Sequence, residues 1–330
     1  MAFHLLLALL TLLLPVSSLT SQCKDPIVRK EWRTLSSSEK TCYLDAVNCI
    51  LTKPSLTPPF HNSGVKSRYD DLLYTHIQQT FSIHYVGHFL PWHRYFVATY
   101  EHMLRTECGY DGAQPYWDWT LDVDSNEAFT NSPVFSPDLG FGGNGPYVEG
   151  NASDPFAVPG RTGGGCVPDG PFSGKDDIVH LGPGSSVAYN PQCLKRDLSP
   201  SFATRYLGMN QTQLTLRQDD YGWFDKVVEG GPSFDASGIH GGGHYGIGGT
   251  YGQMGDLYAS PADPIFYHIS GPIFLMDYDN VQGGNVTLDF EMTVGVSAPN
   301  VTVGDVMDTA SGGGDGIVCY TYDVLYALEA

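Results

Sequence analysis

Histidines on the apolar side of helical patterns constrain this chain more than any other feature of its sequence. His76, His84 and His93 belong to one amphipathic pattern, and His240 and His244 are four residues apart, or about one helical turn. A buried imidazole without a hydrogen-bond partner costs about 1–3 kcal/mol. Shared coordination would satisfy one nitrogen of each ring, so these five histidines are candidate ligands of a metal.

The alternative for any one of them is an ordinary core histidine whose nitrogens find other partners. The spacer between His240 and His244 argues against this alternative, because three glycines in a helix interior cost roughly 2.5–3 kcal/mol relative to alanine. Metal bonds could offset that cost, and the absent side chains would leave space for a neighbouring helix or a substrate. An all-imidazole ligand set suits copper, zinc, iron or nickel, and copper has the highest affinity of these. A zinc protease would need a glutamate between the two histidines, but the spacer consists of glycine only, so this class of enzyme is a poor alternative.

Three helices are predicted before residue 110. Residues 24–52 form a cysteine-bearing helical region with a capping sequence at Ser36. A second helix is expected to begin near Ser67, with His76 on its inner stripe. The third has Pro91 in its first turn and stops at Gly109.

The remaining sequence predicts fewer regular elements. Residues 111–200 are rich in Gly, Pro, Ser and Asp, which indicates a long ordered loop region that contains Cys166 and Cys193. After Thr287, alternating apolar residues favour short strands. The chain has no apparent internal repeat.

Several features predict export from the cell. An apolar run at residues 5–14 is too short for a bilayer core of ~30 Å, so residues 1–20 are expected to be a secretory signal and residues 21–330 one mature domain. The seven cysteines lack CxxC spacing, which favours disulfides and leaves at least one thiol unpaired. Glycosylation sequons begin at Asn151, Asn210, Asn285 and Asn300.

The charge of the chain restricts its partners. A formal net charge of −19 and a pI near 4.7 argue against nucleic acid or an anionic membrane as a partner, because either would be repelled. A small neutral or cationic substrate fits this charge better. The acidic composition alone would also suit a protein that is charged for solubility.

Long motifs around the histidines resemble those of a known family. Residues 87–96 have the sequence GHFLPWHRYF and residues 115–119 the sequence PYWDW, which look like the first copper site of the tyrosinase and catechol oxidase family, nearest its secreted fungal-type branch. His240, His244 and the sequence SPADPIFY at residues 260–267 resemble its second site. The resemblance covers most of the chain after the signal.

The resemblance implies a mainly α fold in which a four-helix bundle surrounds a dicopper site, with long loops and short strands. Carried over by position, His76, His84 and His93 would hold the first copper, and His240 and His244 part of the second. Members of the family use dioxygen to oxidise phenols or catechols to ortho-quinones. The expected partners are therefore a small phenolic substrate and dioxygen.

The sequence departs from the family pattern at the sixth ligand. In the family this histidine stands seven residues after the Asp of Asp-Pro-x-Phe, and here that position is Ser270. His268 precedes it by two residues, about 200° around a helix, which makes His268 a doubtful sixth ligand. Gly271-Pro272 would stop the helix at once, so the fourth bundle helix is expected to be truncated.

Our hypothesis for this departure is that roughly one helix has been lost between Tyr267 and Ser270, by a mistaken gene model, an exon skip or a true deletion. The leading function remains the oxidation of o-diphenols with dioxygen. Its rivals are a degenerate, non-catalytic copper-binding or structural relative and an oxygen-binding protein without turnover.

Two further positions depart from the family pattern. Ser82 stands where some relatives have a cysteine that is linked to the second histidine ligand. Gly241 lacks the side-chain amide that some monophenol-oxidising relatives carry, and this absence favours catechol oxidation.

Overall fold

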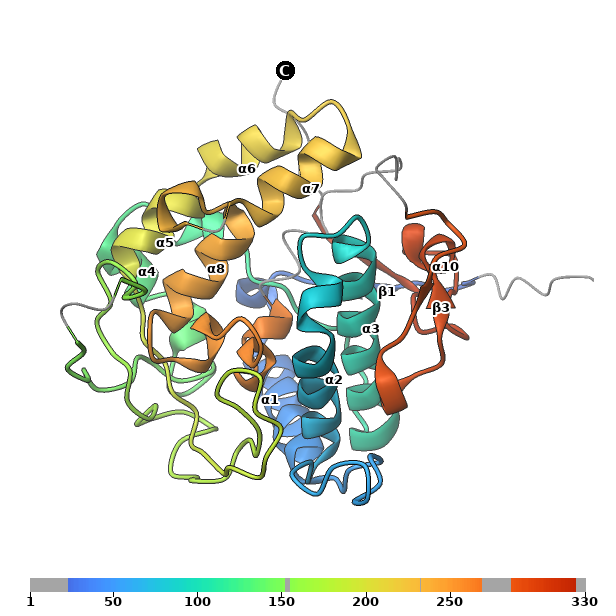
Figure 1. Cartoon of the computed structure of the whole chain (residues 1–330), viewed down its shortest axis with the longest axis horizontal. Helices are drawn as coiled ribbons and strands as arrows, with labels where there is room; N and C mark the ends of the chain where they lie inside the picture. Colours follow the sequence, from blue (N-terminus) through green and yellow to red (C-terminus); the bar gives the residue numbers. More distant parts are fainter. Residues whose placement is uncertain (1–22, 152–154, 232, 269–285, 325–330) are drawn as a thin grey trace, which may run out of the picture.

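The computed structural model describes residues 23–151, 155–231, 233–268 and 286–324, and these are mainly helical (Figure 1). The predicted signal lies outside the described residues. The α-helices are α1 (Ser37–Thr52), α2 (Arg68–Ile83), α3 (Phe89–Cys108), α4 (Asn126–Thr130), α5 (Pro200–Tyr206), α6 (Met209–Leu216), α7 (Tyr221–Glu229), α8 (Ile239–Gly248) and α10 (Val303–Met307).

Short elements connect these helices. The strands are β1 (Ile27–Arg29), β2 (Glu291–Met292), β3 (Val301–Thr302) and β4 (Tyr320–Tyr322). The 3-10 helices are η1 (Trp32–Thr34), η2 (Trp119–Leu121), η3 (Pro133–Phe135), η4 (Phe234–Ala236), η5 (Gln253–Gly255), η6 (Ser260–Ala262) and η7 (Gly295–Ser297).

Helices α2 and α3 lie side by side at the centre of the molecule, and their ends follow local signals in the sequence (Figure 1). Ser67 caps α2 by accepting a hydrogen bond from the backbone N–H of Asp70, whose carboxylate accepts one from the Ser67 N–H in return. Helix α3 stops at Gly109, where φ is +66°, a left-handed conformation that favours glycine. Both predicted helices are thereby confirmed.

The glycines of α8 allow a close approach by α5. A Cβ added at Gly242 would lie 2.7 Å from Cβ of Tyr206, and one at Gly246 would lie 3.0 Å from Cβ of Ala203. Such distances leave no space for a side chain, so the backbones of α5 and α8 could not pack this closely with larger residues. Helix packing therefore explains Gly242 in the spacer between His240 and His244, and Gly246 after it.

The fourth element of the bundle begins at residues 266–268, where the described part of this region ends. Asp263 accepts hydrogen bonds from the backbone N–H of Ile265 and from the guanidinium of Arg196. Tyr267 stacks on Tyr100 of α3 with ring centroids 3.7 Å apart. The predicted truncation falls on residues 269–285, outside the described residues.

The N-terminal region differs from the sequence prediction. Residues 24–36, predicted as part of a helical region, contain β1 and η1, and α1 begins only at Ser37. Strand β1 pairs in parallel with β4, from the far end of the chain. This pairing is non-local, so the local helical pattern could not predict it. The capping box at Ser36 is confirmed.

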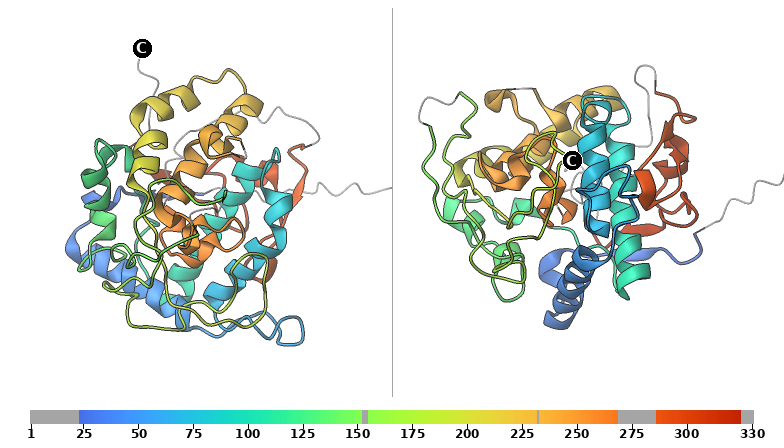
Figure 2. Two further views of the ribbon diagram at one scale, coloured as in Figure 1. Left: turned by 60° about the vertical axis from the view of Figure 1, so that its left-hand side comes forward. Right: turned by 60° about the horizontal axis from the view of Figure 1, so that its bottom comes forward.

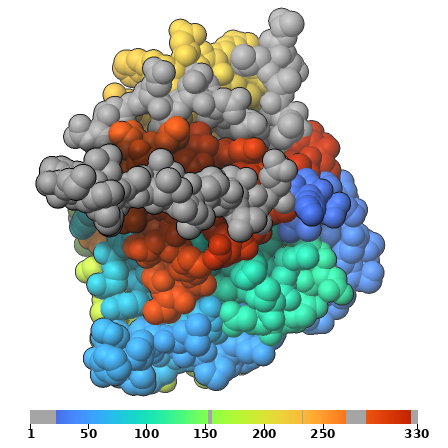
Figure 3. Space-filling view, turned by 90° about the vertical axis from the view of Figure 1, so that its right-hand side faces the viewer, coloured from blue at the N-terminus to red at the C-terminus, as the bar shows by residue number. Residues whose placement is uncertain are grey.

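The segment 286–324 covers the outer side of the α2–α3 pair (Figure 3). The carbonyl oxygen of Thr293 accepts hydrogen bonds from the indole of Trp92 and the side-chain amide of Gln79. Arg94 donates to the carbonyl oxygens of Val306 and Met307. The predicted strands are present here as the short antiparallel pair of β2 and β3.

The predicted loop region and disulfides are also confirmed. Between residues 111 and 199 the described chain contains only α4 and short 3-10 helices, and this region lies beside α8 (Figure 2). Cys42 is the free and exposed cysteine. The disulfides join Cys23 to Cys319, Cys49 to Cys108, and Cys166 to Cys193.

We expect Asp263→Ala to destabilise the protein by about 3–5 kcal/mol, because it would leave Arg196 buried without its counter-charge. Both side chains of this ion pair are fully buried. Urea unfolding followed by circular dichroism measures the change. The control is Asp235→Ala, which breaks the exposed pair with Arg205 and should change stability by less than about 1 kcal/mol. Equal effects of the two substitutions would contradict the prediction.

The burial of His268 makes stability depend on pH. Burial lowers the pKa of His268 to about 3, whereas the unfolded chain protonates near the ordinary value of 6.5. As the pH falls from 7 to 5, the unfolded state gains a proton that the folded state does not, and stability decreases by about 2 kcal/mol. His268→Gln should reduce this loss in urea unfolding at the two pH values. His61→Gln, at an exposed residue, is the control.

Candidate metal centre

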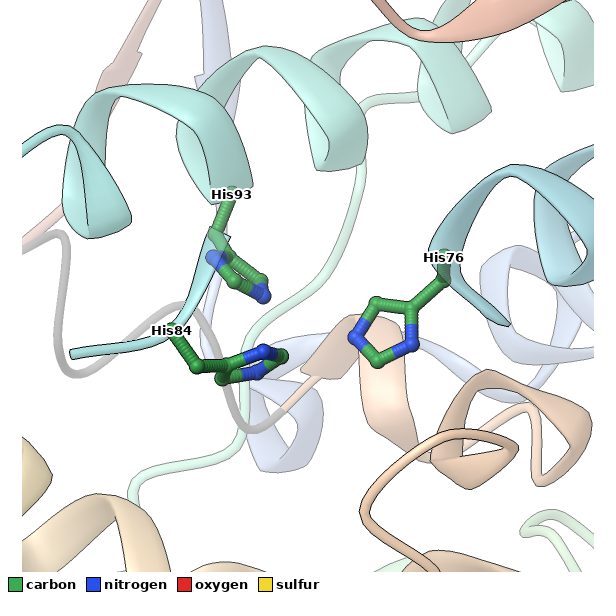
Figure 4. Close-up of side chains that lie close together, drawn as sticks. All are labelled: His76, His84 and His93. Atoms are coloured by element: carbon green, nitrogen blue, oxygen red, sulfur yellow. The ribbon is translucent and has the colours of Figure 1, made fainter. Parts of the chain in front are cut away.

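The structure brings His76, His84 and His93 together in a buried cluster. One ring nitrogen from each lies within 4.8 Å of the other two (Figure 4). His76 is on the inner face of α2, and His93 is one turn into α3. His84 follows the last turn of α2 in an extended conformation, so the connection between the two helices contributes the third ring.

Backbone carbonyl oxygens orient the rings of this cluster. The Nδ1 of His76 lies 2.7 Å from the carbonyl oxygen of Tyr258, and the Nδ1 atoms of His84 and His93 lie 2.8 Å from carbonyl oxygens four residues earlier. A carbonyl oxygen only accepts, so Nδ1 carries the proton on each ring. The Nε2 atoms of His76 and His93 are buried without a hydrogen-bond partner. Their lone pairs are thus available to a metal ion.

His240 and His244 form a second group beside the first. The ring of His240 stacks on that of His84 with centroids 5.8 Å apart. His244 donates from Nδ1 to the carbonyl oxygen of Met254, so its Nε2 accepts a hydrogen bond from the Nε2 of His240, 2.9 Å away. Both Nε2 atoms could bind one ion if the proton of His240 moved from Nε2 to Nδ1.

Aromatic side chains pack against the five histidines, of which His76, His84 and His93 are buried. Phe266 packs against His76 and His244, with ring centroids 5.6 and 6.0 Å apart. Phe89 lies against His93 and His240, with ring centroids 4.6 and 4.8 Å apart. Phe266 belongs to the Asp-Pro-x-Phe motif, but no local pattern indicated that its ring would face both groups of histidines.

The histidines of both groups are held in their neutral form. Burial, together with neighbouring imidazoles, lowers the pKa of His76, His93 and His240 well below the ordinary value. Burial also lowers the pKa of His84, and that of His244 to about 4. Neutral imidazole is the form that binds metal ions, so protons compete weakly with a metal at neutral pH.

His268 is not part of the cluster. Its Nε2 lies 3.0 Å from the hydroxyl of Tyr43, which itself donates to the side-chain oxygen of Gln114. The proton of His268 is therefore on Nε2, the reverse of the tautomer at His76, His84 and His93. The ring packs among aromatic residues of the core, including Trp32 and Phe141. Ser270, the family position of the sixth ligand, lies outside the described residues.

A pocket opens next to His240 and His244. Glu229, at the end of α7, and Tyr85, next to His84, both line it. Burial raises the pKa of Glu229 to about 8, although a hydrogen bond from the backbone N–H of Tyr85 opposes this rise. Burial also raises the pKa of Asp225, one turn earlier on α7, to about 7. No local pattern in the sequence marks these residues, because only the fold places α7 beside the histidines.

Comparisons with known proteins agree with this geometry. Residues 66–269 match the family model of the common central domain of tyrosinase. N-acetyl-6-hydroxytryptophan oxidase ivoB of Emericella nidulans is 34% identical, over 90% of this chain and 92% of its own length. Tyrosinase P of Aspergillus terreus is 32% identical, over 76% of this chain and 74% of its own length.

The alignment with the Emericella protein covers 346 positions, whereas this chain has 330 residues. At least sixteen aligned positions of the Emericella protein therefore have no counterpart in this chain.

Solved structures show the same fold. A mutant polyphenol oxidase from Thermothelomyces thermophila superimposes with a TM-score of 0.76 at 35% identity, over 90% of this chain and 88% of its own. A functional unit of octopus hemocyanin superimposes with a TM-score of 0.51 at 19% identity, over 91% of this chain and 68% of its own, and shares the fold alone. The matched domain and the relatives establish that this chain belongs to the tyrosinase family.

Proposed function

We propose that this protein oxidises o-diphenols to o-quinones with dioxygen, using copper. One observation carries the proposal: His76, His84 and His93 converge with Nδ1 donated to the backbone, which directs Nε2 lone pairs into a buried space. Monophenols are a second substrate class, which the absence of an amide side chain at Gly241 disfavours.

His76, His84 and His93 fit one copper ion. Three neutral imidazoles form a complete protein ligand set, and the orphaned Nε2 atoms of His76 and His93 would gain a partner. Each unsatisfied buried nitrogen otherwise costs about 1–3 kcal/mol. The carbonyl hydrogen bonds hold the rings in the tautomer that metal binding requires, so little rearrangement is needed.

The described residues supply only two of the three imidazoles that a second copper site would need. His240 and His244 supply two imidazoles, and we propose that His268 is not the third, because its ring packs among aromatic residues of the core, beside Tyr43, and not among the other histidines. Phe266 lies on the side that faces the histidines, and an ideal helix would bring position 270 to the same side one turn later. Ser270 cannot replace an imidazole there.

We retain the hypothesis that a helix carrying the missing histidine has been lost near residue 268. The positions of the Emericella relative that have no counterpart here support a loss somewhere in the chain. Sequencing of transcripts across the codons for residues 260–290 is the direct test. A transcript with additional codons for a His-His pair would support the hypothesis, and uninterrupted reads of the present sequence would exclude a mistaken gene model.

The residues of the site act by binding, orienting and excluding water. When bound, copper supplies the electron transfer from the phenol to dioxygen. Each o-diphenol loses two electrons and two protons, so one dioxygen is reduced to two water molecules for every two o-diphenols. Phe266 and Phe89 limit the access of water to the buried imidazoles, and the pocket beside His240 gives a phenol access to the second histidine group.

The alternative function is copper binding without turnover. The hydrogen bond between His240 and His244 favours it, because the two rings satisfy each other without a metal. Such a protein would retain the complete site at His76, His84 and His93 and have a vacant second site. Copper content and oxygen consumption distinguish the two functions.

We expect the purified chain to bind one copper ion tightly, and a second one more weakly. Atomic absorption after dialysis against a weak chelator measures the tight site, and oxygen uptake with 4-methylcatechol measures turnover. At least one copper per chain with catechol-dependent oxygen uptake would support the oxidase. One copper without uptake would favour the non-catalytic alternative, and none would contradict both.

His84→Ala is expected to lower the affinity of the first site for copper by at least 100-fold, because two imidazoles would remain. Competition with a chelator of known affinity measures this change. His102→Ala, at an exposed position on α3, is the matched control and should leave copper affinity unchanged. His268→Ala should also leave it unchanged, and a loss of copper in that variant would overturn our view of this residue.

We also propose that the protein is secreted. Disulfides persist in oxidising compartments, and the sequon residues Asn151, Asn210 and Asn300 are exposed. Among the described residues, no helix is long and apolar enough to cross a membrane. A glycosidase-sensitive mass shift of the expressed protein would test export through a glycosylating pathway.

A further inference from the structure

The carbonyl oxygen that orients His76 belongs to a residue outside the helices. Nδ1 of His76 lies 2.7 Å from the carbonyl oxygen of Tyr258, in the connection between α8 and Asp263. This connection contains η5 and η6, and Tyr258 belongs to neither. The carbonyl groups that orient His84 and His93 belong to α2 and α3 instead. The orientation of His76 therefore depends on what holds the peptide group that follows Tyr258.

The carboxylate of Asp256 holds this peptide group. Its Oδ1 accepts hydrogen bonds from the backbone N–H groups of Tyr258 and Ala259, at 2.9 and 3.1 Å. Its Oδ2 accepts one of 2.6 Å from the backbone N–H of Gly184, in the long loop region before α5. Hydrogen bonds to an ionised acceptor are about twice as strong as those between neutral groups. The carboxylate thus fixes the turn at residues 256–259 from within and ties it to the loop.

One rigid peptide group joins Asp256 to His76. The carbonyl group of Tyr258 and the N–H of Ala259 belong to the same planar trans peptide, so they point in opposite directions. The N–H donates to Asp256, and the carbonyl oxygen accepts from the imidazole. A rotation of this plane would move both hydrogen bonds. The carboxylate also makes the carbonyl oxygen a better acceptor, because hydrogen bonds in a chain polarise one another.

The other carbonyl group of this connection is held by the backbone. Nδ1 of His244 donates to the carbonyl oxygen of Met254. The N–H of the same peptide group, on Gly255, donates to the carbonyl oxygen of Gly252 at 3.1 Å. The acceptor of His244 is thus fixed by a backbone hydrogen bond, whereas the acceptor of His76 is fixed by a side chain.

We propose that Asp256 is a positioning residue for the metal centre. Through the peptide group after Tyr258, it keeps the proton of His76 on Nδ1 and the lone pair of Nε2 directed at His84 and His93 (Figure 4). The arrangement corresponds to the carboxylate–histidine pair that is common at metal sites, with a peptide group inserted between the two. Without this restraint, both tautomers are open to the ring of His76. The inference rests on the proposed function for the identity of the metal, whereas the tautomer is a property of the metal-free chain.

Nuclear magnetic resonance of the metal-free chain with 15N-labelled histidine tests the proposal, because long-range proton–nitrogen correlations distinguish the two tautomers. At pH 8, where the rings are neutral, we expect His76, His84 and His93 to carry the proton on Nδ1. The signals of His76 are identified by their absence from His76→Gln. In Asp256→Ala, the ring of His76 should become a mixture of tautomers, and those of His84 and His93 should not change.

Asp256→Asn assigns the effect to the peptide group rather than to the bond with Gly184. Asparagine is favoured in turns of this kind and retains one oxygen for the N–H groups of Tyr258 and Ala259. It loses the second oxygen, which accepts from Gly184. We therefore expect Asp256→Asn to keep the proton of His76 on Nδ1.

Asp308→Ala is the matched control. The carboxylate of Asp308 is exposed, and its Oδ1 also accepts a hydrogen bond from the backbone N–H two residues later, on Ala310. Removing this carboxylate should leave the tautomers of all the histidines unchanged. If Asp256→Ala does not fold, Asp256→Ser replaces it, because a serine hydroxyl accepts in such a turn more weakly than a carboxylate.

Copper affinity is a second readout of the same variants. In competition with a chelator of known affinity, Asp256→Ala should weaken the first site by about 10- to 100-fold, which is the usual effect of removing a partner of a metal-binding histidine. Asp256→Asn should weaken it by less than about threefold.

The outcomes separate this inference from the proposed function. An unchanged tautomer of His76 in Asp256→Ala would overturn the inference, and so would an equal change in Asp256→Asn. A change that extended to His84 and His93 would also overturn it, since it would reflect a general loss of structure. Oxygen uptake is measured independently: without uptake but with the expected tautomers, the oxidase function fails and the role of Asp256 stands.

Discussion

Hydrogen bonds from imidazole Nδ1 atoms to backbone carbonyl oxygens determine the rest of the site. They fix which nitrogen carries the proton, and therefore which nitrogen presents a lone pair to the centre. The carbonyl acceptors of His84 and His93 are one turn away, at Thr80 and Phe89, so these two rings are oriented locally. A metal that binds here finds ligands already neutral and oriented.

The acceptors of His76 and His244 are not local. They are the carbonyl oxygens of Tyr258 and Met254, which belong to the connection between α8 and Asp263. This connection thus orients one ring of each histidine group. A substitution that moved it would disturb both groups, although none of its side chains need touch a metal.

The sequence predicted those parts of the structure that depend on local signals. The capping box at Ser67, the glycine stop at Gly109 and the inward position of His76 all follow from neighbouring residues. Strand β1 depends on pairing with a segment about 290 residues away, which periodicity cannot reveal. Glu229 was missed for a similar reason, since α7 is adjacent to Tyr85 only in the folded chain. The opposite tautomer of His268 depends on Tyr43, which is 225 residues away in the sequence.

The disulfide between Cys23 and Cys319 closes nearly the whole described chain into a covalent ring. A single proteolytic cut anywhere between these two cysteines would open the ring without releasing a fragment. A nicked protein would therefore keep its mass in non-reducing electrophoresis, and only a reducing gel would expose the break.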